Sequence, residues 1–120
     1  MKRNNILRKP TERKIVLLDY LIKKGSVCVP NDWKSMLLVS PMDDGGMGGL
    51  TLYPHGVLET KRKFGEKVSE CFFYDKDGML VSPALFVDDS GALFELDIFK
   101  GDFSKLIEIP SASNFFDSYK

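Results

Sequence analysis

The chain has 120 residues, of which 43% are hydrophobic and 28% are charged, and these are the proportions of an ordinary globular domain. Its 17 lysines and arginines balance its 17 aspartates and glutamates, which argues against a dedicated nucleic-acid-binding protein because such proteins carry a basic excess. No apolar run exceeds four residues, so no run is long enough to span a bilayer. We therefore predict a single domain over residues 1–120, loosely ordered at residues 1–9 and 111–120.

The net charge of zero conceals a gradient along the chain. Residues 1–40 carry a net charge of +6, residues 41–80 carry −2 and residues 81–120 carry −4. This gradient predicts either a basic and an acidic pole or a mixed surface on which opposite charges lie close together after folding.

The first predicted element is a helix over residues 10–24. Thr11 is a suitable N-cap, and apolar residues recur at spacings of three and four from Ile15 to Ile22, which gives one apolar stripe. Two lysines in the last turn suit the helix dipole, and Gly25 suits the position that follows the helix.

The rest of the chain predicts an antiparallel sheet. Turn signals at residues 75–78 and 88–91 separate its later apolar runs, and short loops favour hairpins. Pro83 cannot donate to a sheet hydrogen bond, so we expect a bulge or an unpaired edge there. One helical turn is expected at residues 102–107. The fold class is therefore α+β, an N-terminal helix packed on an antiparallel, meander-like sheet of about five strands, at residues 34–40, 50–53, 67–74, 79–87 and 92–99.

The residue types of nucleophilic catalysis and metal binding are sparse. Cys28 and Cys71 fit no zinc-binding spacing, so we expect either two reduced thiols or one long-range disulfide. The sole histidine, His55, lies between Pro54 and Gly56, which favours an exposed turn. A secretory signal has an apolar segment directly after its basic start, and the basic start of this chain is not followed by one. We therefore expect a cytoplasmic protein that is not an enzyme and holds no cofactor and no metal.

A glycine-rich segment at residues 43–49 joins the first two predicted strands. It opens with Asp43 and Asp44 and contains four glycines, which permit positive φ angles and close backbone approach. It has neither the Gly-Lys-Ser/Thr ending of a phosphate-binding loop nor the alternating carboxylates of a calcium loop. A hairpin turn is the favoured interpretation, and a small-ligand-binding or enzymatic module built on this turn is the alternative.

Carboxylates gather in the second half of the chain. Glu95 and Asp97 alternate with apolar residues and so share one face of a strand, which Glu70 joins if its strand lies nearby. This face is either solvated or docks a basic protein surface, since charge steers association without catalytic geometry. The basic residues 61–63 are expected at the solvated surface. The candidate partner-binding residues are Asp88, Asp89, Glu95 and Asp97, the outlying Asp43 and Asp44, and the aromatic Trp33 and Phe99.

Four stretches together resemble a family of small uncharacterised bacterial proteins. They are residues 8–11, the glycine turn at 42–50, residues 62–65, and Glu-Leu-Asp-Ile-Phe-Lys-Gly-Asp-Phe-Ser-Lys-Leu-Ile at 95–107. The family carries an Asp/Asn-Asp-Gly-Gly-Met-Gly turn and a Glu-Leu-Asp-Ile-Trp/Phe-Lys-x-Asp-Phe-Ser motif. This chain departs from the pattern at Phe99, where Trp is commoner, and in its extension from Ser111.

The resemblance implies a function only by analogy of size and context. Small bacterial proteins of this kind are often immunity proteins, for example of contact-dependent growth inhibition systems. We therefore expect a monomer that binds a cognate toxin domain, such as a nuclease, and masks its active site. A homodimer or an assembly scaffold built on an exposed sheet edge is a further alternative.

Overall fold

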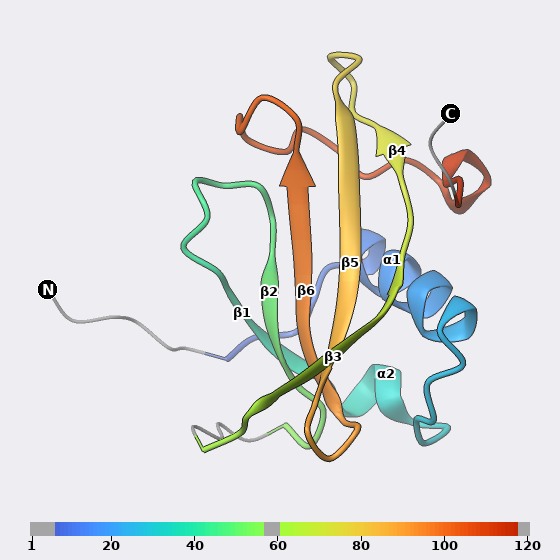
Figure 1. Cartoon of the computed structure of the whole chain (residues 1–120), viewed down its shortest axis with the longest axis vertical. Coiled ribbons are helices and arrows are strands. Elements are labelled where there is room, and N and C mark those ends of the chain that lie inside the picture. Colours follow the sequence, from blue (N-terminus) through green and yellow to red (C-terminus); the bar gives the residue numbers. More distant parts are fainter. Residues whose placement is uncertain (1–6, 57–60, 118–120) are drawn as a thin grey trace, which may run out of the picture.

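A computed structural model describes residues 7–56 and 61–117 of the chain, and its arrangement is shown in Figure 1. The predicted α+β class is confirmed: a helix packs on one open antiparallel sheet with strand order β1-β2-β6-β5-β3, in which β4 also pairs with β5. The order departs from a simple meander at one step, since β3 lies beside β5 and not beside β2. The elements are α1 (Glu12–Lys24), α2 (Trp33–Met36), β1 (Leu38–Pro41), β2 (Leu50–Tyr53), β3 (Phe64–Glu70), β4 (Phe73–Tyr74), β5 (Leu80–Asp88), β6 (Leu93–Lys100) and the 3-10 turn η1 (Ala112–Asn114).

Helix α1 confirms the predicted helix. Thr11 is its N-cap, and the hydroxyl oxygen of Thr11 accepts a hydrogen bond from the backbone N–H of Lys14 at 3.3 Å. Gly25 follows the last turn but has an ordinary φ of −85°, and the left-handed residue is Ser26, with φ 54°. The value of glycine at position 25 is space, because a Cβ there would lie 3.0 Å from the carbonyl oxygen of Val68.

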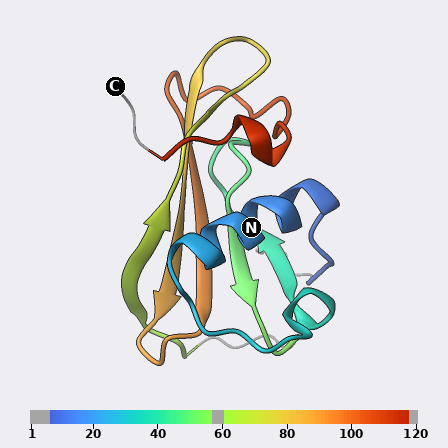
Figure 2. The same ribbon diagram turned by 90° about the vertical axis from the view of Figure 1, so that its right-hand side faces the viewer.

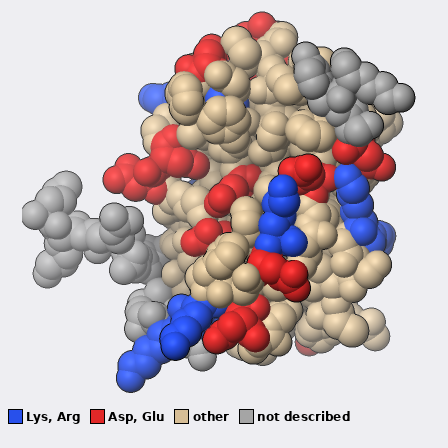
Figure 3. Space-filling model, viewed as in Figure 1, with Lys and Arg blue, Asp and Glu red and all other residues tan. Residues whose placement is uncertain are grey.

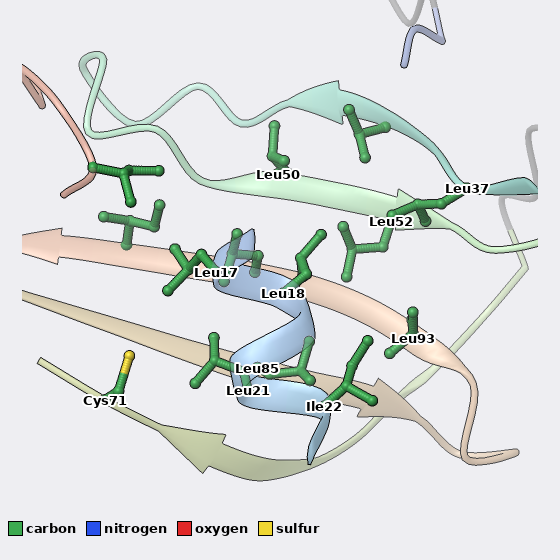
Figure 4. Close-up of a cluster of buried hydrophobic side chains, with 14 of the residues drawn as sticks. Leu17, Leu18, Leu21, Ile22, Leu37, Leu50, Leu52, Cys71, Leu85 and Leu93 are labelled. Atoms are coloured by element: carbon green, nitrogen blue, oxygen red, sulfur yellow. The ribbon is translucent and has the colours of Figure 1, made fainter. Parts of the chain in front are cut away.

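The core lies between α1 and one face of the sheet. Figure 2 shows α1 across that face, and Figure 4 shows the aliphatic side chains that fill the space between them. Leu17, Leu18 and Leu21 of the helix and Leu85 and Leu96 of the central strands are fully buried. Each buried leucine contributes about 1.5–3 kcal/mol relative to an exposed one, so this layer is the main source of stability.

Two predicted strands have different bounds because of local geometry. The strand predicted over residues 34–40 begins as the short helix α2, and its strand portion starts at Leu38. The strand predicted over residues 67–74 is divided into β3 and β4 opposite Pro83. The N–H of Cys71 donates to the carbonyl oxygen of Pro83 at 3.1 Å, and Pro83 has no N–H to return the bond. The bulge or unpaired edge expected at Pro83 is wrong, because β5 pairs with β6 on one side and with β3 and β4 on the other, and Pro83 itself lies opposite Ile98.

The chain after β6 is extended, which makes the predicted helical turn at residues 102–107 wrong. Phe103 has a φ of 64°, which is outside the helical region. The backbone N–H groups of Ile107 and Glu108 then donate to the Asp75 carboxylate. The predicted loose ends are held where the structure describes them: Arg8 pairs with Val39 at the β1 edge, and Phe116 pairs with Phe72. The other predicted loose residues, 1–6 and 118–120, lie outside the described residues.

A buried ion pair closes one end of the sheet. Lys100 is fully buried, and its ammonium donates to Asp75 at 2.8 Å, to Asp77 at 2.7 Å and to the carbonyl oxygen of Lys105 at 3.0 Å. Burial alone would raise the pKa of Asp75, but hydrogen bonds from Lys100 and from three backbone N–H groups outweigh it and lower that pKa to about 2. With Asp75, Asp77 and the carbonyl oxygen of Lys105 as acceptors, the ammonium group of Lys100 uses all three of its donors.

A second buried pair holds the opposite end. The side chain of Arg62 is 8% exposed and donates to Asp88 at 2.9 Å, to the carbonyl oxygen of Leu52 in β2 at 2.6 Å and to that of Leu93 in β6. The β2–β6 ladder runs only through Leu50 and Thr51, so Arg62 links these strands where their backbones no longer pair. The prediction that residues 61–63 lie at the solvated surface is wrong for Arg62.

Replacing Arg62 should destabilise the protein strongly. Arg62→Met leaves Asp88 buried without its cation and two carbonyl groups without a donor, and we expect a loss of about 3–5 kcal/mol. Arg62→Lys should recover only part of this because one ammonium cannot reproduce the planar fork of donors. Urea unfolding measures both, with Lys61→Met as the control because Lys61 is exposed. Equal stability of Arg62→Met and Lys61→Met would contradict the assignment.

Acid should weaken the fold through both aspartates. The folded-state pKa values of Asp75 and Asp88 are lowered from 3.8 to about 2, so their stabilising contribution is present above pH 3.8 and is lost as the pH falls through about 2. Urea unfolding between neutral pH and pH 2 should show this decline, and Asp75→Asn should flatten it. Asp89→Asn, at an exposed position of the neighbouring turn, controls for the substitution itself.

Candidate functional site

The second face of the sheet is not covered by either helix of the described chain (Figure 1). Both helices lie on the other side, and the strands lie in front of α1 in Figure 1. Strand register places three rows of side chains on this face, which we call the open face. The rows are Lys67, Phe86, Glu95 and Thr51; Glu70, Ala84 and Asp97; and Ser82 and Phe99.

The middle of the open face is acidic. Glu70 and Asp97 both lie opposite Ala84, so the small alanine separates two carboxylates and the expectation that Glu70 joins Glu95 and Asp97 is confirmed. Figure 3 shows acidic side chains on the side of the molecule seen in Figure 1, with lysine or arginine side chains beside several of them. Glu70 pairs with Lys67 at 3.0 Å, whereas no described lysine or arginine forms an ion pair with Glu95 or Asp97.

These two carboxylates have raised pKa values. Partial burial raises the pKa of Glu95, and the charge of Asp97 raises it further. Partial burial likewise raises the pKa of Asp97, with the charge of Asp44 adding to the effect. A raised carboxyl pKa means that the ionised group is less favourable in the folded protein than in water. The open face therefore keeps negative charge that the described chain does not compensate.

Aromatic rings flank the acidic centre. Phe99 is 46% exposed and Phe103 is 68% exposed, and their rings meet edge to face with centroids 5.1 Å apart. At the other end of the face, Phe64 is 58% exposed and packs against Phe86. The large exposed fractions of these rings give the open face apolar anchors on both sides of its charge.

The glycine-rich segment forms one wall of a cavity beside β6. The cavity has a volume of about 260 Å³, and we call it the loop cavity; its lining is Met42, Asp44, Met47, Asp97, Ile98 and Phe99. Positive φ angles at Gly45, Gly46 and Gly48 let the segment fold back on itself. The segment therefore confirms the favoured hairpin interpretation and also contributes side chains to a hollow.

Hydrogen bonds fix the shape of that wall. The Asp44 carboxylate accepts the N–H groups of Met47 at 3.1 Å and Gly49 at 2.8 Å. From outside the segment, Lys14 donates to the carbonyl oxygen of Gly48 at 2.6 Å, and the Leu106 N–H donates to that of Gly46 at 3.1 Å. The wall is therefore preorganised by contacts with helix α1 and with the chain after β6.

The structure separates the sequence-predicted site residues into two groups. Asp44, Asp97 and Phe99 meet at the loop cavity, and Glu95 lies beside them on β6. Asp43 and Asp89 are exposed outside the cavity lining. The sequence reasoning missed Met42 and Met47, which no periodic pattern marks, and it placed Phe103 in a helical turn.

Asp88 and Trp33 are parts of the fold. Asp88 is 6% exposed, and beyond its bond from Arg62 it accepts hydrogen bonds from Ser90 and from the Ala92 N–H. Burial would raise the pKa of Asp88, but these bonds lower it to about 2. Trp33 is 7% exposed and belongs to the core. Neither side chain is presented on the open face.

The remaining reactive side chains lie elsewhere. Both cysteines are free, Cys28 exposed and Cys71 buried, and burial raises the pKa of the Cys71 thiol to about 12. His55 is exposed in the turn after β2, as expected. Within residues 7–56 and 61–117, no group of three or more histidine, cysteine, aspartate or glutamate side chains has the geometry to hold a metal ion.

These features define an α+β domain with one buried and one open, acidic sheet face. The family described as a domain of unknown function, DUF6984, matches residues 7–110, and the chain belongs to that family. No curated protein and no solved structure matches this chain. None of the described helices is both long enough and apolar enough to cross a membrane.

Neutralising Asp97 should stabilise the protein. Its folded-state pKa is raised, so its ionised form destabilises the fold at neutral pH, and this loss disappears as the pH falls below the ordinary value of 3.8. Asp97→Asn should therefore raise the melting temperature at pH 7, with a gain that shrinks to nothing at about pH 3. Thermal unfolding across this range tests it, with Asp89→Asn as the exposed control. A lower melting temperature at pH 7 would contradict it.

Proposed function

We propose that this chain is a partner-binding protein whose open face docks a basic protein surface, and more specifically a bacterial immunity protein that masks the active site of a cognate toxin. The observation that carries the proposal is a pair of partly buried carboxylates, Glu95 and Asp97, that no described cation neutralises, set between exposed aromatic rings. The proposal requires no catalytic group on this chain.

Physical chemistry favours a basic partner for such a face. Folding has already removed part of the water from Glu95 and Asp97, so part of the desolvation cost of binding is met before the partner arrives. A cationic surface is attracted to both carboxylates, and long-range charge speeds the encounter. Binding energy in protein interfaces concentrates where such charges adjoin a large aromatic side chain, which Phe99 supplies here.

The toxin partner is proposed from the same chemistry and by analogy with small bacterial immunity proteins of similar size. Nucleases that bind phosphate backbones present basic clefts, and an acidic face competes for such a cleft without copying its substrate. The zero net charge of the chain does not oppose this, because Glu95 and Asp97 form no ion pair with a described lysine or arginine. We infer that the protein acts as a monomer in the cytoplasm of the cell that makes the toxin.

Charge reversal on the open face should abolish binding. The double variant Glu95→Lys with Asp97→Lys replaces attraction by repulsion at the centre of the face, and we expect the affinity to fall by roughly 100-fold or more. The partner for the measurement is captured on the tagged full chain, at low and high salt, from the native lysate supplemented with the product of the upstream reading frame. The parent complex should be stoichiometric and weakened by salt.

A matched double variant controls for charge alone. Glu12→Lys with Asp32→Lys makes the same change of charge on the helix side of the molecule, where Asp32 makes no capping hydrogen bond with its side chain. This variant should bind like the parent. Equal affinities of the two double variants, with both folded by circular dichroism, would exclude the open face as the binding site.

The small-ligand alternative makes a different prediction. If the loop cavity serves a metabolite, a thermal-shift screen with metals, nucleotides and sugars should find a stabilising compound. A ligand present at one hundred times its Kd adds about 2.7 kcal/mol, which is several degrees for a domain of this size. Stabilisation by such a compound without any protein partner would favour that alternative.

A further inference from the structure

The loop cavity has a more specific use within the proposed interface. We propose that it receives one arginine side chain of the partner protein, with the guanidinium group between Asp44 and Asp97 and the aliphatic stem against the methionines. This inference rests on the proposed function, because the arginine belongs to the docked partner. It names the chemical group that the open face recognises.

The apolar walls suit the stem and the plane of an arginine. Met42 and Met47 line the cavity from the glycine-rich segment, and Phe99 lines it from β6. Thioether side chains adapt their shape to an aliphatic chain, and an aromatic ring attracts a guanidinium stacked on it. The sulfur of Met47 also lies 3.4 Å from the backbone nitrogen of Lys100, which donates to it, so this wall is held in place.

The carboxylates supply complementary charge in two different ways. Asp44 is oriented by the N–H groups of Met47 and Gly49, one on each carboxylate oxygen, and each oxygen retains acceptor capacity. Asp97 has no hydrogen-bond or ion-pair partner among the described side chains and backbone groups. It can therefore accept two parallel N–H bonds, the geometry in which arginine exceeds lysine.

The chain's own cations near the cavity are engaged elsewhere. Lys14 donates to the carbonyl oxygen of Gly48, and Lys100 is held by Asp75 and Asp77. The aliphatic part of Lys105 lies against Gly46, and Lys105 forms no ion pair with either carboxylate. Lys14 also lies close enough to Asp44 for the two charges to interact, so Asp97 is the carboxylate of the cavity whose charge remains available to a group from outside the described chain.

The cavity can be tested without the toxin. The probe is N-acetylarginine amide, added to the full chain labelled with carbon-13 at its methionine methyl groups. We expect saturable chemical-shift changes at Met42 and Met47, while the methyl group of Met36, which lies in α2, stays unmoved. N-acetyllysine amide should bind more weakly, and the uncharged N-acetylcitrulline amide should leave the spectrum unchanged.

Variants assign any binding to the cavity. Asp97→Asn should weaken the arginine probe by roughly tenfold, whereas Asp89→Asn, at the β5–β6 turn, should bind it like the parent protein. Phe99→Leu keeps both carboxylates, so it should weaken binding of the arginine probe less than Asp97→Asn does. The dispersion of each spectrum reports folding in the same experiment, so lost binding in a folded variant reflects the cavity itself.

Four results would overturn the inference. They are the absence of saturable shifts at Met42 and Met47, equal shifts with citrulline, equal binding of lysine and arginine, and unchanged arginine binding in folded Asp97→Asn. The failure of the proposed function looks different: the arginine probe binds in the loop cavity, but the toxin still binds the Glu95→Lys and Asp97→Lys double variant. The two proposals are therefore tested separately.

Discussion

A single helix can cover only one face of a sheet, and this constraint organises the molecule. Helix α1 supplies the leucines that bury the inner side chains of the central strands. Because side chains alternate along a strand, each residue of β6 that points into this layer places its neighbours on the other face. Leu96 and Ile98 enter the core, and Glu95, Asp97 and Phe99 are then displayed together. The open face is thus a direct consequence of how the core is filled.

The treatment of charge differs sharply between the two sides of the sheet. At its ends, Arg62 with Asp88 and Lys100 with Asp75 are buried and fully hydrogen bonded, and no buried side-chain nitrogen or oxygen of the described residues lacks a partner. On the open face, Glu95 and Asp97 lose water without gaining a cation. The buried charges of the fold are all paired, whereas Glu95 and Asp97 are not. A basic partner bound at the open face would supply the interaction that these two carboxylates lack.

The sequence was informative where a repeating pattern decides the structure. The stripe of α1 and the alternation of β6 predicted the fold class and put Glu95 and Asp97 on one face. The sequence could not show that Asp88 is buried and Asp89 exposed. Two adjacent aspartates in a turn have the same sequence pattern, and only the folded structure shows that Asp88 pairs with Arg62. The burial of Arg62 could not be predicted for the same reason, because it depends on the carbonyl oxygens of Leu52 and Leu93, which are 10 and 31 residues away in the sequence.

The two most distinctive stretches of the chain meet in space, which gives the loop cavity its significance. Residues 42–49 supply Met42, Asp44 and Met47, and the Glu-Leu-Asp-Ile-Phe-Lys stretch supplies Asp97 and Phe99. Glycine at position 49 permits the approach, since a Cβ there would lie 2.8 Å from both the Asp44 carboxylate and the Met42 sulfur. The glycine-rich segment therefore does more than reverse the chain. It forms a thin wall of the loop cavity, around which two carboxylates and an aromatic ring come together. A recognition site requires this kind of convergence, which a hairpin needed only to reverse the chain would not provide.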